Sequence, residues 1–233
     1  MKRTWSGRYK SALGMVALTA VILLAQPMTL FAQAAYPANA TPFGMTYGDW
    51  MAAYLQYFFS IPADINPVSD TTGADCNVAQ SSTPVFFLNS TWPGISVTRT
   101  CTIPAKALFI ADGWWECSDL EQPPSYGADP QARRRCAARA VNGLGALKLT
   151  VDGEDLTGLL MRVESPSYDF TMPATDNILG LNGVTSGSSV GDAYVVMLQP
   201  LSPGNHVIYF YAAYLSGPAC CGGGSVTYNL TVK

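Results

Sequence analysis

The sequence predicts a mainly β protein, a single β-sandwich or jelly-roll-like domain with an N-terminal amphipathic helix and a short helical insertion. Short segments rich in Val, Ile, Tyr and Phe recur along residues 85–232, separated by Gly, Pro, Asn and Asp turns. Helical periodicity is confined to two stretches, 46–61 and 131–141. The length of 233 residues fits one large all-β domain or two small ones, and we favour one.

The first 34 residues are expected to be an export signal and not part of the fold. Four basic residues within the first ten precede the apolar run 12–25, and residues 32–34 read Ala-Gln-Ala, a pattern that signal peptidase cleaves. The apolar run is shorter than the roughly 18 residues of a spanning helix. We therefore predict cleavage after Ala34, a secreted or periplasmic protein and no membrane span after cleavage; an uncleaved signal anchor is the alternative.

The mature domain, residues 35–233, is expected to begin with an extended lead-in over 35–45 and a helix over 46–61. Aromatic residues recur in the helix at three- and four-residue spacing, Thr46 can cap its start, and Asp49 three residues later completes an approximate capping box. The helix is expected to dock its apolar stripe on the sheet, and a platform on which sugars stack is the alternative.

A turn-rich loop over 64–82, pinned by Cys76, is expected to lead into the densest strand signals of the chain. These signals do not alternate strictly, which indicates burial on both faces of a sheet. The stretch is expected to form a buried pair or trio of strands, which lie at 85–89, 95–103 and 107–111.

Regular β signals vanish between 113 and 142, where we expect a loop and helical insertion. Asp129 precedes a proline that suits the first turn of a helix, so the helix is expected over 131–141. Asp152-Gly153 then marks a hairpin between the next two strands, with a turn longer than two residues. The later strands are expected at 147–151, 158–165, 168–172, 193–198, 206–215 and 226–232.

Six cysteines lie in the mature part, and an even number in an exported chain predicts disulfides. Six cysteines allow 15 pairings, which sequence alone does not resolve. The pairing we favour joins Cys76 to Cys101 and Cys117 to Cys136. The adjacent Cys220 and Cys221 then pair with each other or stay exposed.

Several blocks of the chain resemble a family of uncharacterised bacterial exported proteins. The blocks read NPVSDTTGADC, SVTRTCTIPAKALF, DGEDLTGLLMRVESPSYDFTMPATDNILG and PLSPGNHVIYFYAAY, and they follow one another in the same order as in that family. The resemblance covers residues 47–232. It implies an exported protein and implies no activity, because none is known for the family.

Composition excludes several classes of function. A formal net charge of −3, with Arg133–Arg135 as the only basic run, argues against nucleic acid as a partner. This run is expected on the solvated face of the short helix. The single histidine, His206, is expected to be structural, because no GxSxG segment supplies a nucleophile for it. One histidine also makes a histidine-based zinc or copper site untenable.

Acids and tryptophans meet at one strand end, after residue 111. Asp112 and Glu116 lie beside Trp114 and Trp115, with two further acids following. Glycoside hydrolysis needs two carboxyl groups, one of them with a raised pKa, and tryptophans can stack on sugars and desolvate the acid. Asp112 and Glu116 are therefore the candidate catalytic pair of an alternative, hydrolytic function; otherwise they are solvated loop acids.

No cofactor is expected, and calcium is the one metal whose ligands the sequence could supply. Two sets of oxygen-bearing side chains lie in turns, and neither has the spacing of an EF-hand. Turn chemistry alone explains the second set, around Gly153. The two sets are Asp70, Asp75 and Asn77, and Asp152, Glu154 and Asp155.

The remaining class is binding. Trp92, Trp114 and Trp115 lie near predicted strand ends, on a chain with few charges, and such rings suit carbohydrate or cell-surface polymers. The competing interpretation places these rings in the core. Because neighbouring side chains of a strand point to opposite faces, at least one of Trp114 and Trp115 is expected to be exposed. The sequence thus favours an exported non-enzymatic binding or envelope-associated structural protein, and glycan is the ligand we expect.

Overall fold

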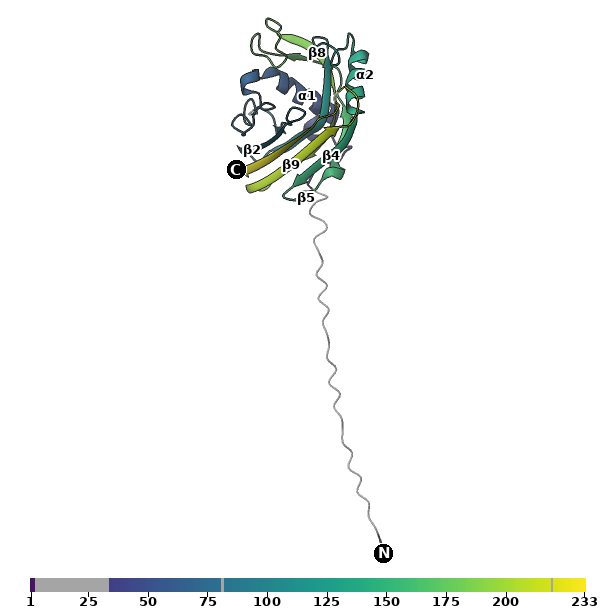
Figure 1. The fold of residues 1–233 in the computed structure, drawn as a ribbon. Helices are drawn as coiled ribbons and strands as arrows, with labels where there is room; N and C mark the ends of the chain where they lie inside the picture. The colour runs from purple at the N-terminus through teal and green to yellow at the C-terminus, as the bar shows by residue number, and fades with distance from the viewer. Residues whose placement is uncertain (3–33, 81, 219) are drawn as a thin grey trace.

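The structure is a computed structural model that describes residues 1–2, 34–80, 82–218 and 220–233. It shows two five-stranded sheets and two α-helices in one domain, so the predicted mainly β class is confirmed (Figure 1). The expected signal segment lies almost wholly outside the described residues. Within the described part of the chain, no helix is long and apolar enough to cross a membrane.

The first sheet, sheet A, is built around the long strands β3 and β8, which pair antiparallel. β1 pairs parallel with β3, and β6 and β7 pair antiparallel with successive parts of β8. The strands of sheet A are β1 (Val85–Leu88), β3 (Ala107–Ser118), β6 (Met161–Glu164), β7 (Tyr168–Thr171) and β8 (Ser186–Leu198).

The second sheet, sheet B, has the order β2-β10-β9-β4-β5, in which β2 pairs parallel with β10 and the other pairs are antiparallel. In Figure 1, β9 and β4 run side by side along one flank of the body. The strands are β2 (Ser96–Ile103), β4 (Leu144–Val151), β5 (Glu154–Asp155), β9 (Gly204–Tyr214) and β10 (Gly223–Val232).

The expected buried trio of strands is divided between the two sheets. β1 and β3 are buried on both faces, whereas β2 alternates exposed and buried residues and lies at an edge of sheet B. The expected buried pair is thus present as β1 and β3 in sheet A, and β2 does not join them as a third strand. The alternation of β2 is what an edge strand with one solvated face requires.

Helix α1 (Tyr47–Ser60) covers the face of sheet A that points away from sheet B. It begins at the predicted cap, because the Thr46 side chain accepts from the Asp49 N–H and the Asp49 carboxylate accepts from the Thr46 N–H. Phe59 stacks on Phe170 of β7, with ring centroids 3.9 Å apart. The predicted docking of the apolar stripe on the sheet is thus confirmed. Short 3-10 helices lie at Pro42–Gly44, Ala63–Ile65 and Thr157–Leu159.

Helix α2 (Pro130–Val141) begins after its predicted cap, Asp129, whose carboxylate accepts from the Ala132 N–H at 2.8 Å. It packs on β3 and β8, and Cys117–Cys136 ties it to β3. The basic run is not uniformly solvated, because Arg133 is buried and donates to the Gly127 carbonyl at 3.2 Å. That expectation was wrong for Arg133, since this residue lies on the face that α2 turns to the sheet.

The strand β3 separates two apolar cores. Phe109 and Ala111 pack in the core beneath α1, whereas Leu108 and Ile110 pack in the core between the sheets. Because side chains alternate along a strand, both faces of β3 are buried, as its unbroken apolar run predicts. β3 also continues to Ser118, so the first six residues of the expected insertion, 113–118, are strand and not loop.

The expected hairpin has a different partner and a shorter turn. Val151 pairs directly with Glu154, so Asp152-Gly153 is a two-residue turn, and both residues have positive φ, 51° and 85°. Two positive φ angles are the signature of the type I′ turn that suits the twist of a hairpin. The expected partner strand, 158–165, instead contributes β6 to sheet A.

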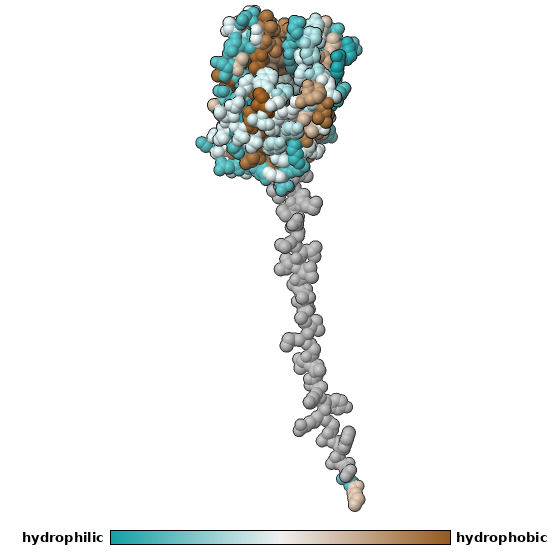
Figure 2. Space-filling view, viewed as in Figure 1, coloured by the Kyte–Doolittle hydropathy of each residue, from teal (hydrophilic) through white to brown (hydrophobic). Residues whose placement is uncertain are grey.

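Apolar residues on the surface are scattered and not gathered into one face. Figure 2 shows brown hydrophobic patches separated by teal and white residues on the side viewed. On the outer face of sheet B, Val207 of β9 is 44% exposed, so only the inner face of this strand is apolar core.

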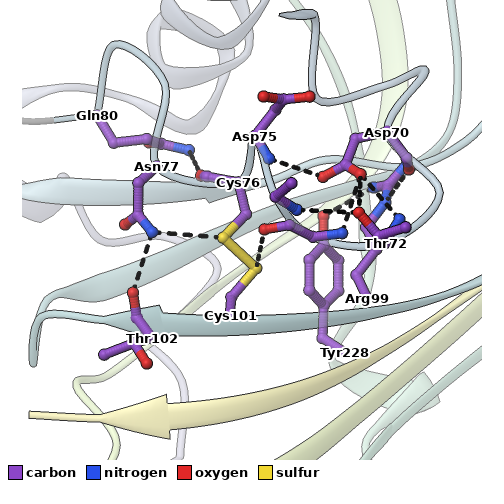
Figure 3. The surroundings of a disulfide bond; sticks show 12 residues. Asp70, Thr72, Asp75, Cys76, Asn77, Gln80, Arg99, Cys101, Thr102 and Tyr228 are labelled. Carbon is purple, nitrogen blue, oxygen red and sulfur yellow. Dashed lines mark hydrogen bonds between the residues drawn. A yellow bond between two sulfur atoms is a disulfide. The ribbon is translucent and has the colours of Figure 1, made fainter.

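The loop before β1 is held against sheet B by a buried arginine (Figure 3). Arg99 of β2 is fully buried, and its guanidinium donates to the Asp70 carbonyl at 2.7 Å and the Val68 carbonyl at 3.1 Å. The same group reaches the carbonyls of Asn89 and Ser90 and the Tyr228 hydroxyl. The Cys76–Cys101 disulfide pins the loop a second time. These contacts fix the chain that leads to Trp92.

The disulfides include the two pairs that we favoured from sequence, and Cys220 is joined to Cys221, which is one of the two arrangements left open for them. Cys117–Cys136 has a sequence separation of 19, and closing a loop of that size restricts the unfolded chain. Replacing both residues with alanine is expected to lower the free energy of unfolding by about 3 kcal/mol, measured by urea denaturation.

The matched control for this prediction is the double substitution of Cys220 and Cys221 with serine. That pair has a sequence separation of 1, so its loss removes little restriction from the unfolded chain. An equal loss of stability from both double variants would contradict the chain-entropy explanation.

Candidate functional site

The candidate site lies where β3 bends away from the regular sheet. The pairing of β3 with β8 is interrupted between Asp112 and Trp115 by a β-bulge. Gly113 stands in the bulge with φ of 55°, and a Cβ there would lie 2.8 Å from a methyl carbon of Leu144. The bulge therefore favours glycine for its backbone conformation, whereas the flexible end of the Leu144 side chain can turn aside to make room.

The bulge directs the two tryptophans to opposite sides of β3. Trp114 contacts α1, with its ring centroid 5.3 Å from that of Phe58, and its indole N–H donates to the Ser90 hydroxyl at 2.7 Å. Trp115 meets Tyr214 of β9 edge-on at 6.2 Å. Each ring is half-buried, so the prediction that at least one of them is exposed holds only in part.

A cavity of about 220 Å³ opens at this edge of β3, beyond the end of β1. It brings together every residue that the sequence analysis named as a candidate binding or catalytic residue, and its wall also includes parts of α1, β9 and β10. Trp92 stands 37% exposed and donates to the Ser69 hydroxyl at 3.1 Å. The predicted residues in its wall are Trp92, Asp112, Trp114, Trp115 and Glu116.

The Asp112 carboxyl group is buried, and none of the ion pairs among the described residues includes it. Only 2% of the residue is exposed, Oδ1 accepts from the Gly113 N–H at 3.0 Å, and Oδ2 has no hydrogen-bond partner among the described residues. Burial raises the pKa of Asp112 to about 7, and the Gly113 N–H opposes this shift. The group is therefore close to half ionised at neutral pH.

Glu116 lies on the other side of β3 from Asp112. It accepts a hydrogen bond from the Ser189 hydroxyl, while Glu121 accepts from the Ser118 hydroxyl at 2.9 Å. Burial raises the pKa of Glu116 well above its usual value, and the neighbouring Glu121 carboxyl raises it further. Burial and the Glu121 carboxyl thus both favour the protonated form of Glu116. Asp112 and Glu116 line one cavity, but they approach it from opposite faces of the strand.

Tyr214 is a site residue that the sequence did not indicate. Its hydroxyl donates to the Trp114 carbonyl at 2.9 Å, and burial, together with Asp112 and Asp192, raises its pKa. The cavity wall also includes Gly222 and Gly224, which follow the Cys220–Cys221 pair. These residues lie about a hundred positions from β3, and only the pairing of sheet B places them here.

His206 has a structural role, as expected. Its Nδ1 lies 2.7 Å from Asp152 Oδ2, and its Nε2 lies 2.9 Å from the Ser202 carbonyl and 3.4 Å from the Ser202 hydroxyl. Burial lowers the pKa of His206, but Asp152 and the Ser202 carbonyl outweigh this effect, so the pKa is raised. An imidazole whose Nε2 proton is given to a carbonyl does not act as a base toward the serine.

The carboxylates of the two candidate calcium sets accept hydrogen bonds from neighbouring backbone N–H groups and side chains. Asp70 accepts from the N–H groups of Thr72, Gly73 and Asp75; burial opposes ionisation, but these bonds hold its pKa below the usual value. Asp152 binds His206, and Asp155 binds Lys148 at 2.6 Å. Within the residues described, no three His, Cys, Asp or Glu side chains are grouped so as to hold a metal ion.

No model of a known protein family and no curated protein matches the chain. Three solved structures show limited similarity. "Structure of PbICP-C in complex with falcipain-2" has 12% identity and a TM-score of 0.29, covering 64% of this chain and 98% of that chain. The cysteine protease inhibitor EhICP2 from Entamoeba histolytica has 14% identity and a TM-score of 0.20, covering 61% and 100%.

The third, "Solution Structure of Amebosin", has 12% identity and a TM-score of 0.17, covering 61% of this chain and 100% of that chain. At TM-scores below 0.5 these similarities support no argument about function. The resemblance to exported bacterial proteins stays a prediction.

Proposed function

We propose that the protein is an exported, non-enzymatic binding protein that holds one sugar unit of a glycan or another cell-surface polymer in the cavity beside Trp114 and Trp115. The observation that carries this proposal is a pair of buried, unpartnered polar atoms that belong to two residues lining the cavity. The Asp112 Oδ2 acceptor and the Trp115 Nε1 donor both lack hydrogen-bond partners among the described residues. A sugar hydroxyl donates and accepts, so neighbouring hydroxyls could satisfy both atoms.

The shape and lining of the cavity support a small saccharide. Its volume of about 220 Å³ is smaller than the roughly 300–1,000 Å³ of sites for drug-sized ligands, so it suits a single ring. Aromatic rings supply apolar faces for the ring carbons. Export is supported by the three disulfides, which persist in oxidising compartments, and by the predicted signal segment.

The test is a glycan array with the mature protein, followed by calorimetric titration of the best glycan. Trp115→Phe keeps an aromatic ring and removes the N–H donor, so we expect the dissociation constant to rise about tenfold. Trp50→Phe is the matched control, because the Trp50 N–H donates to the Pro42 carbonyl, away from the cavity. The proposal is wrong if the wild type binds no glycan, or if Trp115→Phe binds as tightly as the wild type.

A carboxylate-dependent, glycan-active hydrolase is the second candidate, and one observation favours it. Burial raises the pKa of both Asp112 and Glu116, which is what a general acid needs at neutral pH. Turnover of a polysaccharide panel by the wild type, with a loss of at least a hundredfold in both Asp112→Asn and Glu116→Gln, would support hydrolysis. Turnover that survives both substitutions would remove this pair from consideration.

A further inference from the structure

The cavity is acidic, and its acids are not balanced by bases. Asp112, Glu116 and Glu121 line it, and none of its lining side chains within the described residues is Lys, Arg or His. Burial and the neighbouring Glu121 carboxyl raise the pKa of Glu116 well above its usual value. The buried Asp112 and Glu116 carboxyl groups thus have no counter-charge among the described side chains that line the cavity.

Two arginines of the sheets, Arg162 and Arg99, bind groups other than Asp112. Arg162 of β6 lies in the same row of sheet A as Asp112, since Tyr194 of β8 pairs with both. Its guanidinium, however, donates to the Asp192 carboxylate. The Nη2–Oδ2 distance is 2.7 Å and the Nε–Oδ1 distance is 2.9 Å. Arg99 donates to main-chain carbonyls and to Tyr228. Asp112 is therefore left without an ionic partner of its own.

The remaining wall of the cavity is suited to a cation. Trp92, Trp114, Trp115 and Tyr214 contribute rings, and the faces of such rings attract ammonium groups, most strongly where water is excluded. A neutral hydroxyl would give Asp112 one hydrogen bond. An ammonium group would give it a hydrogen bond and the opposite charge, and charge-assisted bonds are about twice as strong.

We infer that the sugar held in the cavity carries a free amine, so the ligand class is an amino sugar whose ammonium group pairs with Asp112 among the aromatic rings. This inference rests on the proposed saccharide binding and narrows it to one kind of saccharide. An N-acetylated sugar lacks the charge, and its acetyl group adds bulk next to a buried carboxylate. It should therefore bind more weakly than the free amine.

The experiment is a calorimetric titration of the mature protein at pH 7 with three trisaccharides of the same linkage, built from glucosamine, N-acetylglucosamine or glucose. We expect the glucosamine trimer to bind at least tenfold more tightly than either neutral trimer, and Asp112→Asn to abolish that preference. Asp155→Asn is the matched control, because this carboxylate is exposed and pairs with Lys148. It should leave the preference intact.

The outcomes separate this inference from the proposed function. Equal binding of all three trimers would overturn the amine preference and leave saccharide binding standing. Binding of none of the three, with no other glycan bound on the array, would overturn both. A preference for the glucosamine trimer that persists in Asp112→Asn would show that another carboxyl group pairs with the amine, and would overturn the assignment to Asp112. Added salt should weaken only the amine-dependent part of the affinity.

Discussion

Replacing Arg99 with methionine is expected to lower the free energy of unfolding by about 4 kcal/mol, one of the largest effects that a single side chain can have. The guanidinium is fully buried and donates five hydrogen bonds, four of them to main-chain carbonyls. Methionine fills a similar volume but donates none of them. Asn89 keeps a hydrogen bond from Tyr228, whereas Val68 and Asp70 would lose the contacts that hold the loop (Figure 3).

Lysine at position 99 is expected to be nearly as damaging as methionine. It keeps the charge but concentrates it at one atom, and it cannot span the carbonyls that the planar guanidinium reaches on both sides. Urea denaturation monitored by tryptophan fluorescence would measure both variants. Arg135→Met is the control, because Arg135 is exposed on α2 and its loss should change stability by less than about 0.5 kcal/mol. A loss below about 1 kcal/mol in Arg99→Met would show that water replaces the guanidinium.

Replacing Asp112 with asparagine is expected to stabilise the protein at alkaline pH relative to acidic pH. The folded pKa of about 7 lies above the usual value of 3.8, so the folded protein prefers the protonated group. That preference is fully present below about pH 3.8 and is lost as the pH rises through 7, where the wild type must ionise a buried carboxyl. The difference between the two pKa values corresponds to about 4 kcal/mol.

The measurement is the stability difference between variant and wild type at pH 4.5 and at pH 8.5. The change in this difference between the two pH values is free of any fixed cost of the asparagine amide. Glu116 is present in both proteins, so its own titration affects both stabilities alike. Asp155→Asn should show almost no change between these two pH values, because hydrogen bonds from Lys148 and Thr157 lower the pKa of this exposed carboxyl and it is ionised at both. A difference for Asp112→Asn that does not change with pH would show that Asp112 is not desolvated.

Together these expectations describe a site that lowers the stability of the fold. A buried carboxylate without a partner is destabilising, and the variant that relieves this cost is also expected to lose the preference for the amino sugar. Arg99 supports the same site from the other side, because it fixes the carbonyl of Ser90, whose hydroxyl accepts from Trp114. Arg99→Met should therefore weaken glycan binding as well as stability.

Local sequence patterns predicted the elements that depend on neighbouring residues. The cap at Thr46, the proline-started helix α2 and the unbroken apolar run of β3 each require only near neighbours, and each is present. The hairpin after β4 was predicted with the wrong partner and a turn that was too long. Alternating apolar residues and turn residues predict that a strand is present, but they do not predict which other strand it pairs with.

For the site, the sequence identified the acids and tryptophans of β3 because they are consecutive. It did not predict that the strand continues through them, since the bulge at Gly113 breaks the regular alternation. It also gave no sign of Tyr214, which enters the cavity from β9 of the other sheet. The sequence by itself determined the class of fold and the group of candidate residues, and it favoured the pairs Cys76–Cys101 and Cys117–Cys136 over the other pairings that it allows.

Only the tertiary structure decided that Asp112 lies buried without a cation. Its pKa depends on how the two sheets and α1 exclude water around it, and that exclusion is set by residues far away along the chain. The sequence of this segment does not distinguish carboxyl groups that are solvated from carboxyl groups that are buried. The packing of sheet A against sheet B makes one of them a site where an ammonium group is expected to bind.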